Sequence, residues 1–378
     1  MPKFVRPAGR ETGNVPMSTV FGPSASPLSP LSPENQTAPA QADAEARPLK
    51  PEDAAAELKG EHAQRPNSTV TEKVNALIHN IEKVIVGKRE TVKQVLCGLL
   101  ARGHILIEDV PGVGKTTLAR ALAKSIDCKF SRIQFTPDLL PSDVVGVSVF
   151  EQRESRFKFH PGPLFANVIL ADEINRTAPR TQSALLEAMN DFQVSVDGHT
   201  HPLPNPFMVL ATENPIEYAG TYPLPEAQLD RFILRVTVGY PDRDSELAML
   251  KGHKLAHPIE HLDPVITAEE VAQLQDLVRT VAVEDALSNY ILEIADKTRH
   301  HKGLMLGVSP RGVKMLYRAA QASAVLDARK YVVPDDIKRL VIPVLTHRII
   351  EKNRDAGGAR RDGENILAEI LEEVPVPI

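Results

Sequence analysis

Two kinds of hydrophobic periodicity alternate along the chain from about residue 68. Apolar residues at helical spacing predict amphipathic helices in residues 68–87 and 88–103. The short apolar run in residues 104–109 predicts a strand, and "KTTLARALAKSI" then returns to helical spacing. A strand, a glycine-containing loop and a helix therefore follow one another directly.

Further strands are expected where the pattern becomes continuous or strictly alternating. "NVILADEINR" begins at Asn167 and "FMVLATENP" begins at Phe207, and each starts as a short apolar run. Alternation in "GVSVFEQ" and "SRFKFHP" around a polar turn predicts a β-hairpin ahead of the first of these strands. "QVSVDGHTHPLP" predicts a second hairpin, because Asp197-Gly198 is a strong signal for a tight turn.

The remainder of the chain, from about Tyr240, has helical periodicity. "TAEEVAQLQDLVRTV" begins with the spacing of a capping box, from Thr267 to Glu270. Three more amphipathic helices follow, and Pro334 stands at the expected start of the last one. This part of the chain is predicted to be a helical domain that resembles a lid.

The first 67 residues lack either periodicity. They are rich in proline, alanine and serine and hold few large apolar side chains, so they cannot bury enough surface to offset the entropy of ordering. We expect a disordered tail without a role of its own, in preference to a tether or docking arm. Met17 leaves open a shorter translated product.

Composition narrows the class of protein further. At 378 residues the chain is long enough for about two or three domains. The net charge of −5 and an aromatic content of 4% give no reason to expect nucleic acid as a partner. Two cysteines make a disulfide framework improbable, and no apolar run approaches the roughly 18 residues of a membrane span. We expect a cytoplasmic protein with no membrane insertion.

The loop between the first strand and its helix has the chemistry of a phosphate-binding loop. Its backbone N–H groups and the helix N-terminus favour anions, Lys115 would reach the β- and γ-phosphates, and the Thr116 hydroxyl would ligate Mg²⁺. The common pattern has glycine where this chain has Asp109, but aspartate tolerates turn geometry and Gly112 adds a second turning device. The residues expected to bind nucleotide here are Pro111, Gly112, Val113, Gly114, Lys115, Thr116 and Thr117.

Polar residues at the ends of the later strands complete a hydrolytic site. Asp172 would hold Mg²⁺ through water, and Glu173 would act as general base for the attacking water. Asn214 follows the third strand and would orient that water. Arg231 and Arg311 suit γ-phosphate sensing, because arginine offers a fixed fork of donors to phosphate oxygens.

Five blocks of sequence, in order, closely resemble the MoxR-type AAA+ ATPases. The resemblance implies an α/β fold, namely a P-loop αβα core with a parallel sheet and hairpin inserts in residues 68–240, followed by a helical lid in residues 241–378. It also implies ATP and Mg²⁺ as cofactors and a homo-oligomeric ring, commonly a hexamer. The blocks are "EDVPGVGKTTLARALA", "QFTPDLLPSDVVG", "ILADEINRTAPRTQSALLEAM", "ATENPIEYAGTYPLPEAQLDRF" and "SPRGVKMLYRAA".

The resemblance also implies residue roles and a kind of partner. Asn214 would be the first sensor, Arg231 the arginine finger and Arg311 the second sensor, whereas Ile85, Val86 and Gly87 would contact adenine. Partners in such a family are often proteins with a von Willebrand A-type domain, and the work is chaperone-like maturation. Two other arginines, Arg235 and Arg176, compete with Arg231 for the role of finger.

Three other functions remain to be weighed. A nucleic-acid motor is a rival because AAA+ relatives with hairpin inserts act on DNA, and an unfoldase that threads chains is another. The block "QFTPDLLPSDVVG" lacks the aromatic-apolar-glycine loop of such unfoldases. A simple P-loop kinase does not account for Glu173, Asn214 and Arg231 together with a lid.

Overall fold

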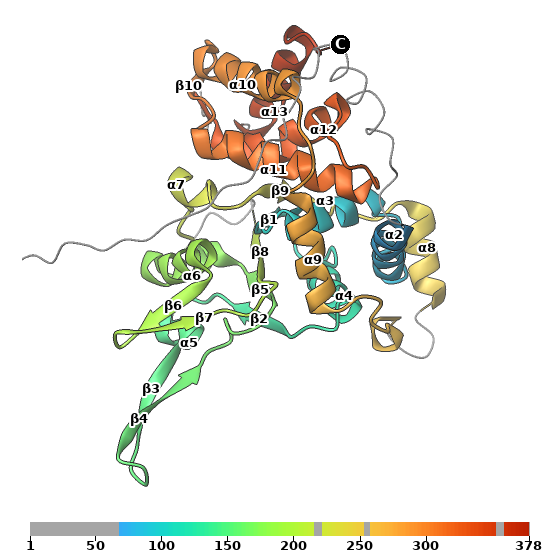
Figure 1. The fold of residues 1–378 in the computed structure, drawn as a ribbon. Coiled ribbons are helices and arrows are strands. Elements are labelled where there is room, and N and C mark those ends of the chain that lie inside the picture. Colours follow the sequence, from blue (N-terminus) through green and yellow to red (C-terminus); the bar gives the residue numbers. More distant parts are fainter. Residues whose placement is uncertain (1–67, 215–220, 253–257, 353–358, 378) are drawn as a thin grey trace, which may run out of the picture. The chain divides into compact units, whose positions relative to one another are not determined.

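The computed structural model describes residues 68–214, 221–252, 258–352 and 359–377. These residues belong to one compact unit (Figure 1). The predicted disordered tail, residues 1–67, lies outside the described residues. Among the described helices, none is long and apolar enough to cross a bilayer.

Helices and strands alternate in the first part, and helices dominate the second. The helices are α2 (Ser68–Glu82), α3 (Arg89–Leu100), α4 (Lys115–Ser125), α5 (Pro141–Val145), α6 (Pro179–Asp191), α7 (Glu226–Leu229), α8 (Arg243–Gly252), α9 (Ala268–Val278), α10 (Asp285–His300), α11 (Pro310–Leu326), α12 (Pro334–Leu345) and α13 (Ala359–Glu373). The strands are β1 (Ile105–Glu108), β2 (Phe130–Gln134), β3 (Gly146–Glu151), β4 (Arg156–Pro161), β5 (Val168–Asp172), β6 (Gln193–Val196), β7 (His199–Pro202), β8 (Met208–Glu213), β9 (Leu234–Val236), β10 (Leu304–Leu306) and β11 (Ile350–Glu351).

Five strands form one parallel sheet in the order β2-β5-β8-β1-β9. All five strands point the same way, so their carboxyl ends meet at one edge. After β1 the chain crosses to β2 at one edge of the sheet, and the next strands, β5 and β8, lie progressively closer to β1. The strand order therefore reverses beside β1. Ligands of open α/β sheets bind at such a reversal, outside the carboxyl ends of the strands.

Alternate residues of the buried strands enter two separate apolar clusters. In β1, Ile105 and Ile107 join the cluster that contains α2, α3 and α4, whereas Leu106 joins the cluster that contains α5 and α6. This period of two is what a strand buried on both faces requires. The sheet therefore has helices on each face, as Figure 1 shows, and the predicted αβα core is confirmed.

The C-terminal helices form the predicted lid and share an apolar cluster with the core. Within the lid, α11 packs on α10 and α12, and α12 on α13; toward the core, α11 packs on α3, and α12 on β9. The capping box is confirmed, because Thr267 Oγ1 accepts a hydrogen bond from Glu270 N–H at 3.2 Å and Glu270 Oε2 accepts one from Thr267 N–H. Pro334 is the first residue of α12, as expected. The limits 68–240 and 241–378 remain predictions, because one apolar cluster includes residues from both sides of residue 240.

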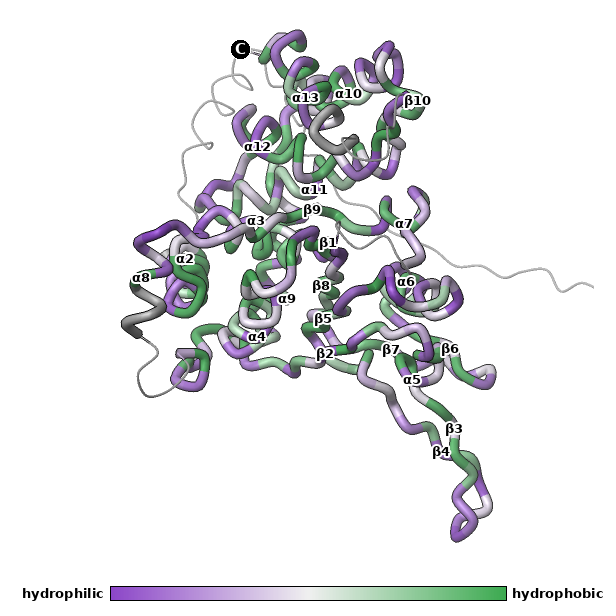
Figure 2. The backbone as a smooth tube through the Cα atoms, turned by 180° about the vertical axis from the view of Figure 1, so that it is seen from behind, coloured by the Kyte–Doolittle hydropathy of each residue, from purple (hydrophilic) through white to green (hydrophobic). Residues whose placement is uncertain are grey.

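Both predicted hairpins are present. Strand β3 pairs antiparallel with β4, and β6 pairs with β7 around a turn in which Asp197 has φ 51° and Gly198 has φ 77°. Two successive positive φ values are the signature of the type I′ turn that Asp-Gly favours. The β3–β4 hairpin extends away from the sheet and carries hydrophobic stretches along its length (Figure 1, Figure 2).

Candidate active site

The loop after β1 has an open glycine-rich surface at the edge of the sheet. Gly112 has φ 88° and Gly114 has φ 95°, values that side-chain-bearing residues rarely adopt. A Cβ atom placed on either glycine would meet no other atom within 4 Å. Gly114 caps the N-terminus of α4, whose first residues are Lys115, Thr116 and Thr117. The loop thus offers free approach to backbone N–H groups at a helix N-terminus, which is where phosphate binds.

Asp109 fastens this loop to the segment that follows β9. Its side chain is buried and accepts hydrogen bonds from the N–H groups of Val110, at 2.9 Å, and Gly239, at 2.6 Å. Its main-chain oxygen accepts a bond from Lys115 Nζ at 2.6 Å. The aspartate that replaces the usual glycine therefore connects two loops at the carboxyl edge of the sheet.

Burial and three carboxylates act in opposite senses on Lys115. Loss of contact with water is the larger effect and lowers the pKa of the ammonium group below its ordinary value. The charges of Asp109, Asp172 and Glu173 act to raise that pKa. Asp172, the last residue of β5, and Glu173, which follows it, are therefore close enough to the loop for their charge to act on its lysine.

Asp172 ends strand β5 with both carboxylate oxygens engaged. Oδ1 accepts a hydrogen bond from the Thr212 hydroxyl at 2.7 Å, and Oδ2 accepts one from Arg132 Nη2 at 2.6 Å. Thr212 belongs to β8 and Arg132 to β2, which are the two neighbours of β5 in the sheet. The predicted metal-binding acid is therefore held from both adjacent strands.

Glu173 turns sharply out of the strand. Its backbone has φ 57° and ψ 51°, a left-handed conformation that is uncommon for glutamate, and its N–H donates to Thr212 Oγ1 at 2.8 Å. Its Oε2 accepts a hydrogen bond from Gln134 Nε2 at 2.7 Å and pairs with Arg176 Nε at 3.3 Å. Both contacts are made by Oε2, and the other carboxylate oxygen, Oε1, takes part in neither of them.

The segment expected to contact adenine lies against the chain that follows β9. Gly87 has φ 75°, and a Cβ atom there would lie 2.5 Å from Ser245 Oγ, so no larger residue fits without movement. Lys88 Nζ donates to the carbonyl oxygen of Tyr240 at 2.7 Å. Val86, two residues before Lys88, is half-buried. Because Asp109 holds Gly239, the Val86–Gly87 segment and the loop of residues 109–114 (the phosphate loop) are attached to the same stretch of chain.

The two predicted sensors, Asn214 and Arg311, and the predicted finger, Arg231, lie in different parts of the structure. Asn214 follows β8 and is buried, at the same edge of the sheet as Asp172. Arg231 donates to the carbonyl oxygen of Leu186, and Arg311 Nη2 donates to Asn190 Oδ1 at 2.7 Å. Both arginines therefore contact α6, and among the residues that the structure describes neither donates a hydrogen bond to the loop between β1 and α4.

The competing fingers have partners within their own chain. Arg235 lies on β9, not on a helix, and only 10% of its side chain is exposed. It pairs with buried Glu108 at 3.2 Å and with Glu364 of α13. Arg176 pairs with Glu173 itself. Through these two ion pairs Arg235 connects β9 with β1 and α13, which is a structural role.

Three residues of the site were missed by sequence reasoning, namely Arg132, Gln134 and Thr212. Parallel pairing brings Gln134 directly opposite Asp172, and Thr212 is the one hydroxyl residue within the apolar strand β8. The available signal was a polar residue near the carboxyl end of each neighbouring strand. This signal identifies the three residues only when the strand order is known, because the order shows that β2 and β8 are the neighbours of β5.

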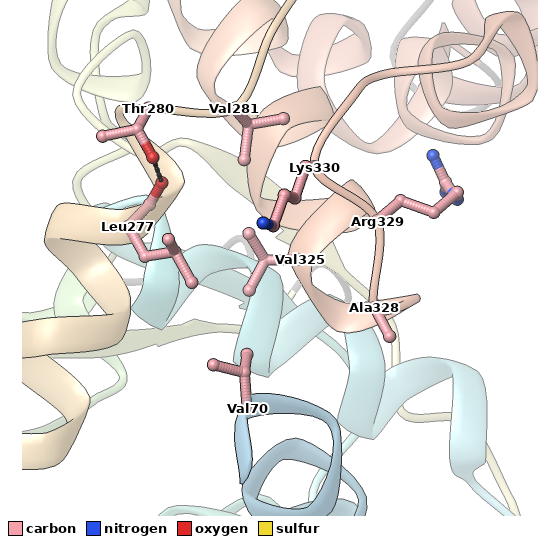
Figure 3. A pocket seen from close by; sticks show the side chains of 8 residues that line it. All are labelled: Val70, Leu277, Thr280, Val281, Val325, Ala328, Arg329 and Lys330. Atoms are coloured by element: carbon pink, nitrogen blue, oxygen red, sulfur yellow. Dashed lines mark hydrogen bonds between the residues drawn. The ribbon is translucent and has the colours of Figure 1, made fainter. Parts of the chain in front are cut away.

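The site residues fit a nucleotide with Mg²⁺. The open glycine loop, a lysine and a helix N-terminus match phosphate, while the hydroxyl of Thr116 and the carboxylate of Asp172 are oxygen ligands of the type Mg²⁺ prefers. By contrast, a pocket of about 240 Å³ between α2, α9 and α11 contains none of these residues. Its walls are mainly apolar, and Figure 3 shows Lys330 directed toward them.

Comparison with known proteins agrees with this geometry. The family model described as the ATPase family associated with various cellular activities (AAA) matches residues 104–234, and that of the AAA lid domain matches residues 296–370. The uncharacterized protein YeaC of Bacillus subtilis is 53% identical over 301 residues, covering 80% of this chain and 94% of that protein. Chaperone MoxR1 of Mycobacterium tuberculosis is 38% identical over 309 residues, covering 79% and 81%. A solved structure from Cytophaga hutchinsonii, described provisionally as an ATPase, superposes with a TM-score of 0.75 at 37% identity, covering 86% of this chain and 99% of that one.

Proposed function

The chain belongs to the MoxR-type AAA+ ATPases, and from this premise we propose that it hydrolyses ATP and uses the energy to remodel or mature client proteins. The observation that carries the proposal is the convergence of an open glycine loop, Lys115, Asp172 and Glu173 at one edge of the sheet. The name of the relative MoxR1 supports a chaperone-like role.

Binding of nucleotide is assigned to the loop and to the segment beside it. Gly112 and Gly114 would offer backbone N–H groups to the phosphates, and Lys115 would exchange its bond to Asp109 for a phosphate oxygen. Val86 and Gly87 would line the adenine. Thr116 and Asp172 would hold Mg²⁺, which when bound neutralises phosphate charge. Arg132 would keep Asp172 in place from the neighbouring strand.

Hydrolysis is assigned to Glu173 as the residue that takes a proton from water. Gln134 and Arg176 hold its Oε2, so the orientation of the carboxylate is fixed while Oε1 is outside those contacts. Asn214 would orient the same water from the adjacent strand. Arg231 would act on the γ-phosphate in the next subunit, and Arg311 would act as the sensor of the lid.

The working assembly in this proposal is a homo-oligomeric ring, a hexamer, in the cytoplasm. The clients would be proteins with a von Willebrand A-type domain or another folded domain, held by the exposed hairpins. A nucleic-acid motor is the other candidate, but a net charge of −5 and few aromatic residues do not favour it.

Trapping of a client tests this proposal. Glu173→Gln should retain ATP and its client, because binding residues are intact while turnover is lost. Affinity capture with this variant in ATP should retain a specific protein that Lys115→Ala, the matched variant unable to bind ATP, does not retain. Equal capture by both variants, or ATP turnover stimulated by DNA, would contradict the assigned role.

A further inference from the structure

The segment that contains the candidate finger Arg231 is held by a residue of the lid. Arg348, which follows α12, has only 1% of its side chain exposed, and its Nε donates to Asp230 Oδ1 at 2.8 Å. Its terminal nitrogens donate to the carbonyl oxygens of Asp230 and Ile233, each at 3.4 Å, and to that of Phe232. The rigid fork of a guanidinium thus fixes the backbone on both sides of Arg231.

The same carboxylate is attached to the helix that carries Arg311. Asp230 Oδ2 accepts a hydrogen bond from the hydroxyl of Ser309 at 3.3 Å, and Ser309 Oγ caps α11 by accepting one from Gly312 N–H. A Cβ atom on Gly312 would lie 2.9 Å from Cδ of Arg348, so this first turn of α11 packs closely on the arginine. The start of α11, Arg348 and Asp230 are therefore one connected cluster.

Helix α6 provides a second connection between the two candidate arginines. Arg231 donates to Leu186 O, and Arg311 donates to the side chain of Asn190, one turn later on the same helix. A shift of α11 relative to the core would therefore disturb the surroundings of Arg311 and of Arg231 together.

We infer that Arg348 is a positioning residue that, through Asp230, places Arg231 according to the position of the lid. The lid of one subunit would then control hydrolysis in the neighbouring subunit that receives its finger. This inference rests on the proposed ring in which Arg231 acts across the subunit boundary. It goes beyond that proposal because it assigns the control of the finger to the contact that Asp230, just after α7, makes with the start of α11 and with Arg348 beyond α12.

Mixed rings test the inference by placing one substitution in either of two subunits. Lys115→Ala subunits would supply fingers without hydrolysing, and Arg231→Ala subunits would hydrolyse without supplying fingers. Asp230→Asn keeps the shape of the side chain and weakens its bond to Arg348. When Asp230→Asn is placed in the Lys115→Ala subunit, the kcat of the mixed rings should fall by about tenfold or more, and KM for ATP should not change. The reason is that a small misplacement of a catalytic group lowers the rate strongly. When Asp230→Asn is placed in the Arg231→Ala subunit, kcat should change little.

Two further variants separate positioning from general stability. Ser309→Ala breaks the connection of Asp230 to α11 while leaving Arg348 in place, and should show the same dependence on subunit. Glu364→Gln weakens another contact between core and lid, at Arg235, without touching Asp230, and should show no such dependence. Losses of equal size in either subunit, or no loss in either, would overturn the inference. If verified mixed rings without these substitutions recover no activity, the finger across the boundary fails and the inference fails with it.

Discussion

Asp109 shows how one side chain can replace a glycine and take on a different task. Its carboxylate accepts the N–H groups of Val110 and Gly239 in a buried position, and so joins the phosphate loop to the chain beyond β9. A glycine at this position would free the loop and leave both N–H groups without that acceptor. The departure from the common pattern is therefore a structural feature of this chain.

We predict that Asp109→Gly, which restores the common glycine, destabilises the protein. The free energy of unfolding should fall by about 1–3 kcal/mol, because buried donors lose a charged acceptor and the chain gains freedom when unfolded. Urea denaturation measures this change. Asp109→Asn keeps one acceptor oxygen, so its free energy of unfolding should lie between those of the wild type and Asp109→Gly. Wild-type stability in Asp109→Gly would show that the contact with Gly239 contributes nothing.

His104, just before β1, predicts a dependence of stability on pH. Its ring contacts the carbonyl oxygen of Met189 and the N–H of Val209, which together require a neutral ring with the proton on Nε2. Complete burial lowers its pKa from 6.5 to about 4. Between these values the unfolded chain binds a proton that the folded chain does not, so stability falls as pH falls through this window.

The expected loss from His104 is about 2–3 kcal/mol between pH 7 and pH 4.5. His104→Gln can supply both a donor and an acceptor but does not titrate, so its stability should depend less steeply on pH. Urea denaturation of both proteins across this range makes the comparison. Parallel pH profiles would show that His104 is not the group responsible.

At the scale of elements, the β3–β4 hairpin exposes more apolar surface than folding requires. Phe150 and Phe157 are paired across the two strands in an edge-on arrangement, with ring centroids 5.3 Å apart, and Phe157 is 72% exposed. A lone two-stranded hairpin is only marginally stable. Because Phe157 is so exposed, the pair buries little apolar surface and therefore adds little to the stability of the fold. This favours a role in contacting another protein.

We expect Phe157→Ser to affect capture of clients more than stability. The free energy of unfolding should change by less than about 1 kcal/mol, whereas capture by the Glu173→Gln variant should decline. Leu292→Ser, at a 51% exposed position on α10, is the matched control and should leave capture unchanged. Undiminished capture by Phe157→Ser would place the client elsewhere.

The sequence predicted those elements whose signals are local. Asp197-Gly198 determines its own turn, and Thr267 with Glu270 determines a helix start, because each involves neighbours along the chain. The pairing of Arg132 with Asp172 spans 40 residues and depends on the order of strands. For the same reason Arg235 was a plausible finger until its place on β9 and its pair with Glu108 were known.

At the scale of the whole molecule, the core and the lid are connected at several points near the site. Helix α11 packs on α3, α12 packs on β9, and Arg235 of the sheet pairs with Glu364 of α13. Asp109 joins the phosphate loop to the chain that leaves β9. A change at the proposed nucleotide site would therefore have direct physical routes to the lid, as the proposed remodelling activity requires.

The most direct test of this account compares ATP binding and phosphate release in the wild type, Lys115→Ala and Glu173→Gln. Lys115→Ala should lose affinity, because a positive charge at the phosphates disappears. Glu173→Gln should bind ATP as the wild type does and release phosphate slower by a factor on the order of 10² or more, because only the general base is removed. Wild-type turnover in Glu173→Gln, or no ATP hydrolysis by the wild type, would contradict the central claim.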